Sequence, residues 1–590
     1  MENSSLSLKG STILTDTLLQ IFKYSRLNKI YSESKDQSPL VAINLLLDQL
    51  AINIDLPEDD LPNIPEKGPF IVVSNHPFRG IDSMLLFKII YSRRDDFKIM
   101  ASHLLKDIQP LSGIIIPVNT YERTGGEQSS YRGIREGLAH LRDGHCIGIF
   151  PTAEDSKHWD APKIILDQDW KTSVLKFVRM ANVPVVPVYF HGTKSRLIHI
   201  IRKINPLIQK EELPKELLNK RKRTIKIRIG APISAREQAE FSSITKYGRY
   251  LRARVYTLGS AIEHEKPMAR LVKTVRSRPE DIINPVHVET LVEEFEKIRP
   301  DHELFVTKNY SILCAPVELM PNIFREIGRL REVTFREVGE GTNKSIDIDE
   351  YDIYYHHLFI WDTDERRLVG AYRIGKGKDI LTNYGINGFY INSLFNINRE
   401  FGPILKEAIE LGRSFIARDY QKKVIPLFLL WKGIMVFLLK NTDYRYLIGP
   451  VSISNDLSRF SKTLIVEFIR NYFWDEELSK LIRPKKDFVP KPDKAIDRSV
   501  FIDFSERDIN KIERIITDIE PGYHIPILLK KYLEINSRII GFNIDPKFNN
   551  CLDGLMILDT YKTPREFLQG LSREMNDPSI LKRFTTDQAI

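Results

Sequence analysis

Short apolar runs alternate with amphipathic stretches along the chain from residue 68 onward. The apolar runs, which have the length of buried strands, are Phe70–Val73, Gly113–Val118, Cys146–Phe150, Val183–Phe190 and Ile225–Ile229. The stretches between them that predict helices are Met84–Tyr91, Tyr131–Arg142 and Thr172–Met180. Strands that alternate with helices in this way predict an α/β layer fold.

A second region with the same alternation begins near Phe305. Its predicted strands are Tyr310–Ala315, His357–Trp361, Leu368–Arg373, Phe389–Phe395 and Tyr446–Ser452. Its predicted helices are Leu319–Phe335, Gly402–Glu410, Ile425–Lys440 and Pro526–Leu533. We expect two α/β domains, with the chain divided into an N-terminal helical segment (1–55), a first domain (56–245), a helical connector (246–304), a second domain (305–565) and a C-terminal tail (566–590).

The composition is that of a globular protein with material for large cores. Of 590 residues, 42% are hydrophobic and 28% are charged, which excludes a mostly disordered, collagenous or polytopic membrane chain. The three cysteines, Cys146, Cys314 and Cys551, are too few and too scattered for a disulfide framework or a four-cysteine zinc site. We therefore expect a reducing cytosol, with no metal and no cofactor.

The sequence also bears on membranes. The most apolar window, Val424–Leu439, is sixteen residues long and interrupted by Lys432. A spanning helix needs about 20 apolar residues, so this window predicts a buried helix. Residues 1–10 lack the apolar run of a signal peptide, and the apolar positions of residues 13–22 predict packing on the first domain or, alternatively, contact with a membrane interface. Any membrane contact would be peripheral.

A histidine and an aspartate stand in the turn after the first predicted strand. Phe70–Val73 runs into Ser74-Asn75-His76-Pro77-Phe78-Arg79-Gly80-Ile81-Asp82, and an apolar helix begins at Met84. Side chains just past a strand end lie at the carboxyl edge of the sheet, where α/β folds bind ligands. His76 there can take a proton from a hydroxyl while Asp82 fixes its tautomer and stabilises the imidazolium. The alternative is a turn in which Asp82 only caps the helix.

Two further blocks follow this turn in order. They are Phe150-Pro151-Thr152-Ala153-Glu154-Asp155-Ser156 and Val183-Pro184-Val185-Val186-Pro187-Val188. With the His76 turn, they make residues 60–235 resemble the glycerolipid (lysophospholipid) acyltransferase family, above all its branch that O-acylates lyso-ornithine lipid. The resemblance implies that His76 is the general base and Asp82 its orienter. It implies substrate-binding roles for Asn75, Gly80, Phe150, Pro151, Glu154 and Pro187.

This region departs from the family pattern at two places. Five residues, as in the ornithine-lipid branch, and not the usual four, separate His76 from Asp82. The block that usually ends in an arginine for glycerol phosphate reads Gly113–Asn119 and contains no arginine. Without a guanidinium to pair with a phosphate, a phosphorylated acceptor is disfavoured, although Arg123 and Arg132 could substitute.

The C-terminal region carries four short motifs in the order R-x3-F, D-x-D-x2-D, G-x-Y-R and E-x-x-R-S, made of charged residues and one phenylalanine. They are Arg331, Phe335, Asp347, Asp349, Asp352, Arg373, Glu410 and Arg413. Taken singly, each piece could be a solvated loop, a strand-end arginine or an exposed i,i+3 helical pair. In this order, residues 305–565 resemble the acyl-homoserine-lactone synthases and the related ornithine N-acyltransferases, relatives of the GNAT fold that take acyl groups from acyl carrier protein.

The chemistry that this second resemblance implies requires an amine to lose a proton. Asp349, Asp352 or Glu410 could be the base or could hold a cationic amino acid, and the sequence does not decide between them. Arg331, Arg373 and Arg413 are candidates to bind the substrate carboxylate or to support the acidic cluster, with Phe335 in the substrate site. Residues 418–426, where a GNAT pyrophosphate loop would lie, contain no glycine, which favours acyl carrier protein over acyl-CoA.

The two resemblances together predict a bifunctional aminolipid synthase. The second domain would N-acylate ornithine with a 3-hydroxyacyl group, and the first would O-acylate the lyso-ornithine lipid so formed. The alternatives are the same steps on another amino acid such as glycine, a lysophospholipid acyltransferase whose second domain acts on an unrelated amine, or a second domain that is a non-catalytic docking module.

The charge balance suits this prediction. Lys and Arg exceed Asp and Glu by 87 to 78, a formal charge of +9, with basic clusters at 202–203, 220–223 and 485–486. We assign the excess to acidic acyl carrier protein and to an anionic membrane surface, and not to nucleic acid, because aromatic residues are not interleaved with these clusters. The expected location is the cytoplasm, peripheral on the inner face of the cytoplasmic membrane.

Overall fold

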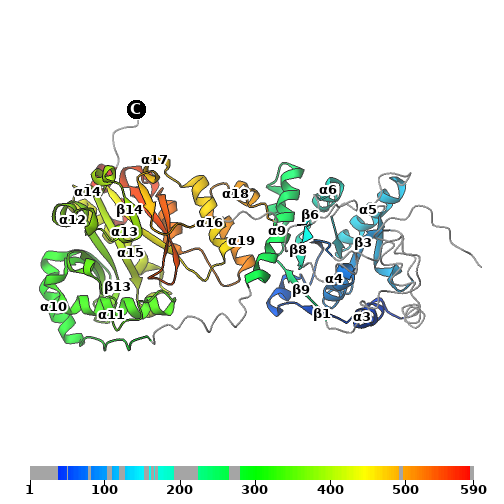
Figure 1. Cartoon of the computed structure of the whole chain (residues 1–590), viewed down its shortest axis with the longest axis horizontal. Coiled ribbons are helices and arrows are strands. Elements are labelled where there is room, and N and C mark those ends of the chain that lie inside the picture. Colours follow the sequence, from blue (N-terminus) through cyan, green and yellow to red (C-terminus); the bar gives the residue numbers. More distant parts are fainter. Residues whose placement is uncertain are drawn as a thin grey trace, which may run out of the picture. The chain divides into compact units, whose positions relative to one another are not determined.

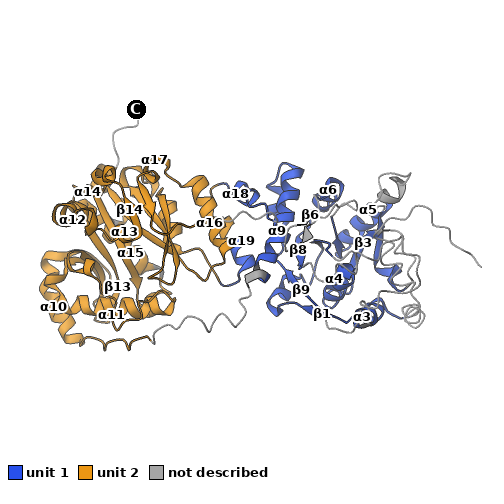
Figure 2. Cartoon of the chain, viewed as in Figure 1, with its two compact units in different colours: residues 1–266, 492–506, 514–522 blue, residues 267–491, 507–513, 523–590 orange. Residues whose placement is uncertain are grey.

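The computed structural model describes residues 37–49, 51–77, 81–102, 109–118, 127–151, 159–160, 165–166, 170–191, 223–264, 279–490 and 496–584. The sequence predictions for residues 13–22, Gly80, Arg123, Glu154, residues 202–203 and residues 220–222 lie outside this part. The chain forms two compact units (Figures 1 and 2). Unit 1 comprises residues 1–266, 492–506 and 514–522, and unit 2 comprises residues 267–491, 507–513 and 523–590.

Unit 1 is built on a seven-stranded sheet with the order β1-β9-β8-β2-β5-β3-β4. In that order the strands are Ile52–Asp55, Arg223–Ile229, Val185–Phe190, Phe70–Ser74, Cys146–Ile149, Lys98–Ser102 and Ile115–Val118. All neighbours are parallel except β8 and β9, so the carboxyl ends of β2, β5 and β8 lie at one edge. Strand β6 (Trp159–Asp160) pairs antiparallel with β7 (Ile165–Leu166).

Helices cover this sheet (Figure 1). They are α3 (Pro39–Gln49), α4 (Ile81–Tyr91), α5 (Glu127–Arg142), α6 (Thr172–Ala181), α8 (Ala235–Ala239) and α9 (Ile244–His264). A further helix of unit 1, α18 (Ser499–Ser505), packs on α9. One apolar core joins α4 to the sheet, and it contains Phe70 and Val72 of β2 and Leu85 and Leu86 of α4. The strand before His76 and the helix that contains Asp82 therefore share one core.

Unit 2 is built on an eight-stranded sheet with the order β10-β11-β12-β13-β15-β16-β19-β18. In that order the strands are Glu303–Thr307, Tyr310–Pro316, His356–Asp362, Arg367–Lys376, Ala408–Ile416, Tyr446–Ile453, Cys551–Asp559 and Arg538–Asp545. Neighbours are antiparallel except β15 and β16, which pair in parallel only over residues 408–410 and 446–448. Beyond these residues the two strands separate, which opens the sheet at its centre.

Eleven of the α-helices that the structure describes lie in unit 2, and one more is shared between the units. Those of unit 2 are α10 (Val288–His302), α11 (Pro321–Glu337), α12 (Gly377–Tyr384), α13 (Ile391–Leu394), α14 (Gly402–Lys406), α15 (Val424–Lys440), α16 (Arg459–Tyr472), α17 (Glu476–Ser479), α20 (Ile527–Glu534), α21 (Arg565–Met575) and α22 (Ser579–Phe584). Helix α19 (Ile509–Ile519) begins in unit 2 and ends in unit 1, and β14 (Phe395–Ile397) pairs with β17 (Ile482–Pro484). As predicted, the apolar window of α15 is mostly buried. No helix in the described residues has the length and apolarity needed to cross a membrane.

The predicted α/β class is confirmed in both units, but three local predictions are wrong. Residues 52–55 form strand β1 and not helix, because Ile52 and Ile54 alternate with polar residues in the period of a strand. Residues 389–395 form mainly a helical turn, α13, and not a strand. Residues 408–410, predicted to end a helix, begin strand β15, so Glu410 and Arg413 are strand residues and not an exposed helical pair.

Candidate active sites

The first candidate site lies at the carboxyl edge of the unit 1 sheet. His76 follows the end of β2, and Asp82 is the second residue of α4. The Nδ1 atom of His76 lies 2.9 Å from Oδ1 of Asp82, and the side chain of His76 is 11% exposed while that of Asp82 is fully buried. Because the carboxylate contacts Nδ1, proton uptake by the imidazole falls to Nε2. The carboxylate thus faces the histidine, as an orienting group would.

Asn75 fixes the backbone beside His76. Its Nδ2 donates to the carbonyl of Phe190 at 2.9 Å, and its Oδ1 accepts from the N–H of Phe190 at 2.8 Å. This pair of bonds joins the end of β2 to the end of the neighbouring strand β8, and Asn75 is almost completely buried. Both polar ends of the amide are thereby engaged with backbone, which favours a positioning role for Asn75 over direct contact with substrate.

The remaining residues predicted for this site come from β5 and β8. The Phe150 ring, just past β5, lies 4.4 Å from the His76 ring between centroids. Pro151 follows it and accepts a hydrogen bond from the N–H of Lys171. Pro187 is buried inside β8, where it lies opposite Val73 of β2. The structure therefore gathers His76, Asp82, Asn75 and Phe150 at one edge and places Pro187 within the strand behind them.

In unit 2, three arginines and three aspartates form a buried network. Arg331 donates to Asp347 at 3.1 Å and to Asp352 at 2.8 Å. Arg373 donates to Asp349 at 2.5 Å and to Asp352 at 3.2 Å. Arg413 donates to Asp349 at 3.2 Å and lies 3.4 Å from Asp347. The aspartates of D-x-D-x2-D and the arginines of R-x3-F, G-x-Y-R and E-x-x-R-S are thus one cluster in space.

The electrostatics of this network argue against a base within it. Burial alone would raise the pKa values of Asp347 and Asp352, but nearby arginines outweigh burial. Arg331 and Arg413 lower the pKa of Asp347, and Arg331 and Arg373 lower the pKa of Asp352. The side chains of Asp349 and Asp352 also cap the turn at residues 350–353 reciprocally. A carboxylate that stays ionised is a weak base, so the network is better suited to holding β13, β15 and the residue 347–353 loop in place.

Glu410 lies in a different environment. It accepts hydrogen bonds from the Tyr355 hydroxyl and from the backbone N–H groups of Tyr390, at 3.2 Å, and Ile391, at 2.8 Å. Burial raises its pKa from 4.5 to about 7, although the Tyr355 and Ile391 bonds lower it in part. These bonds also explain why residues 389–395 form a helical turn, because the carboxylate gathers successive N–H groups at the start of α13.

We expect the Glu410→Gln substitution to reduce the pH dependence of stability. Between the unfolded pKa of 4.5 and the folded pKa of about 7, the folded chain keeps a proton that the unfolded chain has released. The contribution of this group to stability therefore falls as pH rises through that window, by about 3 kcal/mol in total, and then levels off. The melting temperature of the parent protein should drop more between about pH 5 and about pH 8 than that of the variant.

The exposed Glu400 offers a matched control for this measurement. Glu400→Gln makes the same chemical change on the surface of unit 2 and should leave the pH dependence of melting as it is in the parent protein. An equal drop in melting temperature for the parent protein and for Glu410→Gln would contradict a buried carboxyl that titrates near neutrality.

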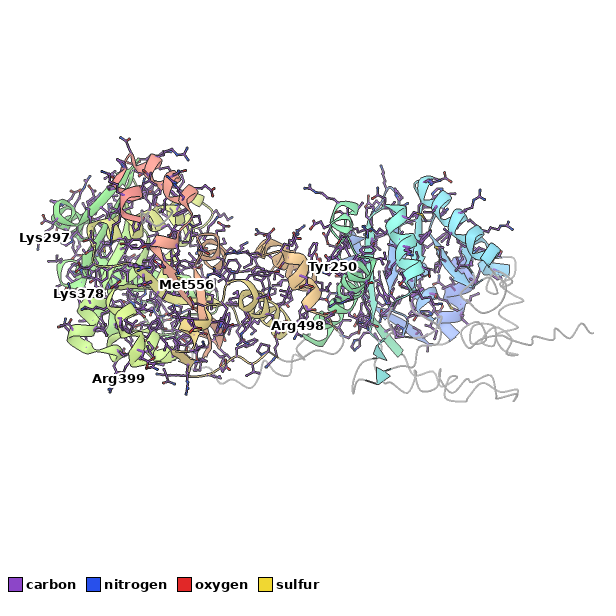
Figure 3. All side chains as sticks on the ribbon, turned by 90° about the horizontal axis from the view of Figure 1, so that it is seen from above. Tyr250, Lys297, Lys378, Arg399, Arg498 and Met556 are labelled. Carbon is purple, nitrogen blue, oxygen red and sulfur yellow. The ribbon has the colours of Figure 1, made fainter. Side chains whose placement is uncertain are left out.

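The second candidate site is a pocket of about 330 Å³ where β15 and β16 separate. Residues 411–414 of β15 and 449–452 of β16 form two of its walls. The other walls are formed by Phe335, Tyr390, Pro526, Ile527, Leu528, Tyr532, Phe548 and Met556, the last of which is labelled in Figure 3. Of the residues predicted from sequence, Phe335 and Arg413 line the pocket, whereas Arg331, Arg373 and Glu410 do not.

Arg413 is the cation of this pocket. Its backbone has a φ of 51°, which is uncommon for a residue with a side chain and is typical of functional positions. Its guanidinium lies 4.4 Å from the centroid of the Phe548 ring and is bonded to Asp349 of the buried network. The network therefore fixes a positive group at the wall of the pocket, where it could bind a carboxylate.

Three carboxyl groups that the sequence analysis did not single out also line the pocket, namely Glu340, Asp545 and Asp553. Burial, with a smaller contribution from Asp545, raises the pKa of Asp553 to about 7, although the Ser452 hydroxyl, which donates at 2.7 Å, opposes this rise in part. Burial and Asp456 raise the pKa of Glu340. Asp553 lies inside the mostly apolar stretch 551–559, and a charged residue in such a strand is a sequence feature that could have indicated a functional role.

Among the described residues, no three His, Cys, Asp or Glu side chains gather in a way that could hold a metal ion. All three cysteines are buried and unpaired.

The two units match two different families. Residues 53–264 match the acyltransferase family, and residues 330–431 match the acetyltransferase (GNAT) domain family. The glycine N(alpha)-acyltransferase of Phocaeicola vulgatus is 31% identical over 287 residues, which are 46% of this chain and 86% of that protein. The lyso-glycine lipid O-acyltransferase of Bacteroides thetaiotaomicron is 24% identical over 249 residues, which are 41% of this chain and 88% of that protein.

A solved structure, the 1-acyl-sn-glycerophosphate acyltransferase of Thermotoga maritima, aligns with 43% of this chain and 96% of its own. The identity is 17% and the TM-score 0.26, which is too low for this alignment to bear on the fold.

Proposed function

Because this chain belongs to the aminolipid acyltransferases, with an acyltransferase unit followed by a GNAT unit, we propose that it makes a diacylated ornithine lipid in two steps. Unit 2 attaches a 3-hydroxyacyl group to the α-amine of ornithine. Unit 1 then esterifies the 3-hydroxyl of that product with a second acyl group. The product of one unit is thus the acceptor of the other.

In the N-acylation step, the amine nitrogen attacks the thioester carbonyl carbon, an N–C bond forms and the C–S bond breaks. The proton that the amine loses must reach the leaving thiolate. We assign this transfer to Asp553, because it lines the pocket and its pKa of about 7 suits a group that accepts and then returns a proton. Arg413 holds the carboxylate of the amino acid, and the Arg–Asp network with Glu410 keeps the strands around the pocket in place.

In the O-acylation step, Nε2 of His76 takes the hydroxyl proton as the oxygen attacks the second acyl thioester. The O–C bond forms, the C–S bond breaks, and the imidazolium returns the proton to the thiolate. Asp82, 2.9 Å from Nδ1, stabilises the imidazolium in between. Asn75 sets the position of this strand end, and Phe150 packs against the imidazole ring.

The single observation that carries the choice of ornithine is the charge inside the unit 2 pocket. Arg413 stands there with three carboxyl groups, those of Glu340, Asp545 and Asp553. Glycine has one carboxylate and one amine, whereas ornithine has a second amine that would be an ammonium at neutral pH. The excess of acidic groups therefore supports a diamino acid. The identity to a glycine N(alpha)-acyltransferase supports glycine as the second candidate.

The proposal includes acyl carrier protein as donor and a membrane surface as the place of action. Residues 418–426 contain no glycine and the chain carries a formal charge of +9. A positive chain is attracted both to an acidic carrier protein and to the anionic inner face of the cytoplasmic membrane, where the lyso-lipid acceptor would lie. The enzyme would bind there peripherally.

Lipid mass spectrometry of a bacterial host that lacks aminolipids tests the whole proposal. After expression of the full chain, we expect a new lipid that contains ornithine, one amide-linked acyl group and one ester-linked acyl group. A diacylated glycine lipid would replace ornithine by glycine in the proposal. A host whose lipids are unchanged, although the protein is present and the carrier protein is acylated, would contradict it.

A further inference from the structure

Unit 1 contains a segment that lies far away in the sequence. Residues 492–506 and 514–522 belong to unit 1, although residues 267–491 belong to unit 2 (Figure 2). We call the described part of this stretch, residues 496–522, the returning segment. It comprises α18 (Ser499–Ser505) and α19 (Ile509–Ile519). Residues 507–513, which include the first half of α19, belong to unit 2, and the rest of the segment belongs to unit 1.

The returning segment completes an aromatic core on α9. The Phe504 ring stacks on Phe241 with centroids 5.2 Å apart and an angle of 12°, and it lies 4.8 Å from the Tyr250 ring. The Phe501 ring meets Tyr250 edge-on at 5.9 Å. Tyr250 on α9 and Arg498 at the start of α18 are labelled in Figure 3. All four rings are buried, and α18 supplies two of them.

Two arginines of α9 bind acidic residues of the same segment, and Arg254 also pairs with Glu237 at 3.3 Å. Arg249 donates to Asp497 at 2.6 Å and to the Ser499 hydroxyl at 3.0 Å. Arg254, only 7% exposed, donates to Asp518 and, at 2.9 Å, to the Tyr250 hydroxyl. Burial disfavours the charge of Arg254, and a buried guanidinium that lost Asp518 would be costly to keep. The segment thus supplies both apolar cover and counter-charge.

Helix α9 connects this core to the first candidate site. Tyr256 of α9 packs on Tyr189 of β8 with ring centroids 5.8 Å apart, and Gly259 lies so close to Tyr189 that an added Cβ would stand 2.7 Å from its ring. The residue after Tyr189 is Phe190, whose backbone is bonded twice by Asn75, the neighbour of His76. The contacts therefore run without a break from the returning segment through α9 and β8 to the catalytic turn.

We infer that the returning segment is a built-in clamp that completes the O-acyltransferase unit, so that O-acylation depends on residues of the C-terminal half of the chain. The surface that it covers is an interaction surface whose partner is this named segment. It is made of Phe241, which precedes α9, and of Arg249, Tyr250 and Arg254 on α9. The inference concerns the assembly of unit 1 and holds whichever amino acid unit 2 acylates.

Cleavage of the purified full chain tests the clamp. A protease site is inserted between Lys266 and Pro267, where the first stretch of unit 1 ends, and the cut protein is passed over a size-exclusion column. We expect the fragments 1–266 and 267–590 to elute together and to keep their O-acylation activity. Separation of the parent fragments under these conditions would overturn the inference.

Substitutions at Phe504 show whether the clamp is what holds the fragments. Phe504→Asp places a charge in the aromatic core and should let the cut fragments separate with loss of O-acylation. Phe504→Ala is the milder variant, and it should raise the dissociation constant of the fragments by at least about 100-fold. Fragments that stay together with unchanged affinity in Phe504→Ala would also overturn the inference.

A matched control comes from the same helix. Asp503, the exposed neighbour of Phe504 on α18, is changed to Ala and should leave fragment affinity and O-acylation as in the parent protein. N-acylation by unit 2 is measured in every variant before cleavage. It should persist in Phe504→Ala, which separates a damaged clamp from a protein that has failed to fold.

Discussion

The His76→Ala variant is expected to lose O-acylation by roughly 10³-fold while N-acylation continues, so a host that expresses it should accumulate the monoacylated lyso-lipid. The reason is the geometry of the turn after β2. The imidazole is held against Asp82 at 2.9 Å and against the Phe150 ring, at the edge where three parallel strands end. The ratio of monoacylated to diacylated lipid, read by mass spectrometry, measures the effect.

His145 offers a close control for this variant. Its Nδ1 lies 2.9 Å from Asp96, the same distance as in the His76–Asp82 pair, but it precedes β5 and so stands at the amino edge of the sheet. His145→Ala should leave the diacylated lipid in place. Diacylated lipid at the parental level in His76→Ala would show that the base of the O-acylation step is another group.

The turn at His76 was predictable because its signals are local. The local sequence consists of an apolar strand, a turn with Pro and Gly, and an apolar helix. This order alone predicts that His76 and Asp82 lie at a sheet edge, without information from distant parts of the chain. The hydrogen bonds between Asn75 and Phe190 could not be predicted from composition or spacing, because the two residues lie 115 positions apart in sequence. The edge of the sheet is therefore readable from sequence, and the contacts that hold it are not.

In unit 2, the motif order indicated which residues gather but not what they do there. The spacing gave equal standing to Asp349, Asp352 and Glu410, whereas burial and the neighbouring arginines give the last two opposite shifts in pKa. The hydrophobic periodicity also gave a wrong prediction at Glu410. Strand β15 begins directly after the short helix α14, and in such an apolar stretch the two elements together resemble one longer helix.

The pocket of unit 2 could not be predicted from the motifs, for a different reason. Asp545 and Asp553 stand on the hairpin of β18 and β19, which reaches the opening between β15 and β16 only through the sheet order. The returning segment is a similar case, since Arg249 and Asp497 are 248 residues apart in sequence. Long-range pairing of this kind leaves no periodic trace in the chain, so it had to come from the fold.

The second large effect is expected in the unit 2 pocket, where the two aspartates should fail in different ways. Asp553→Asn removes the group proposed to take the amine proton, so kcat for N-acylation should fall by about 10²-fold or more with little change in KM. Asp545→Asn removes a carboxylate proposed to hold the second ammonium of ornithine. KM for ornithine should then rise on the order of tenfold to a hundredfold, while KM for glycine stays as it was.

Steady-state kinetics of the full chain, with a 3-hydroxyacyl carrier protein as donor and ornithine or glycine as acceptor, separate these outcomes. The control is Asp559→Asn, which lies on the same strand as Asp553 but pairs with Arg445 at 2.7 Å and does not line the pocket. It should keep both activities. Equal losses with ornithine and glycine in Asp545→Asn would remove the case for a diamino acid. A kcat that survives in Asp553→Asn would place the base elsewhere, with Glu410 as the next group to test, because its pKa is also raised to about 7.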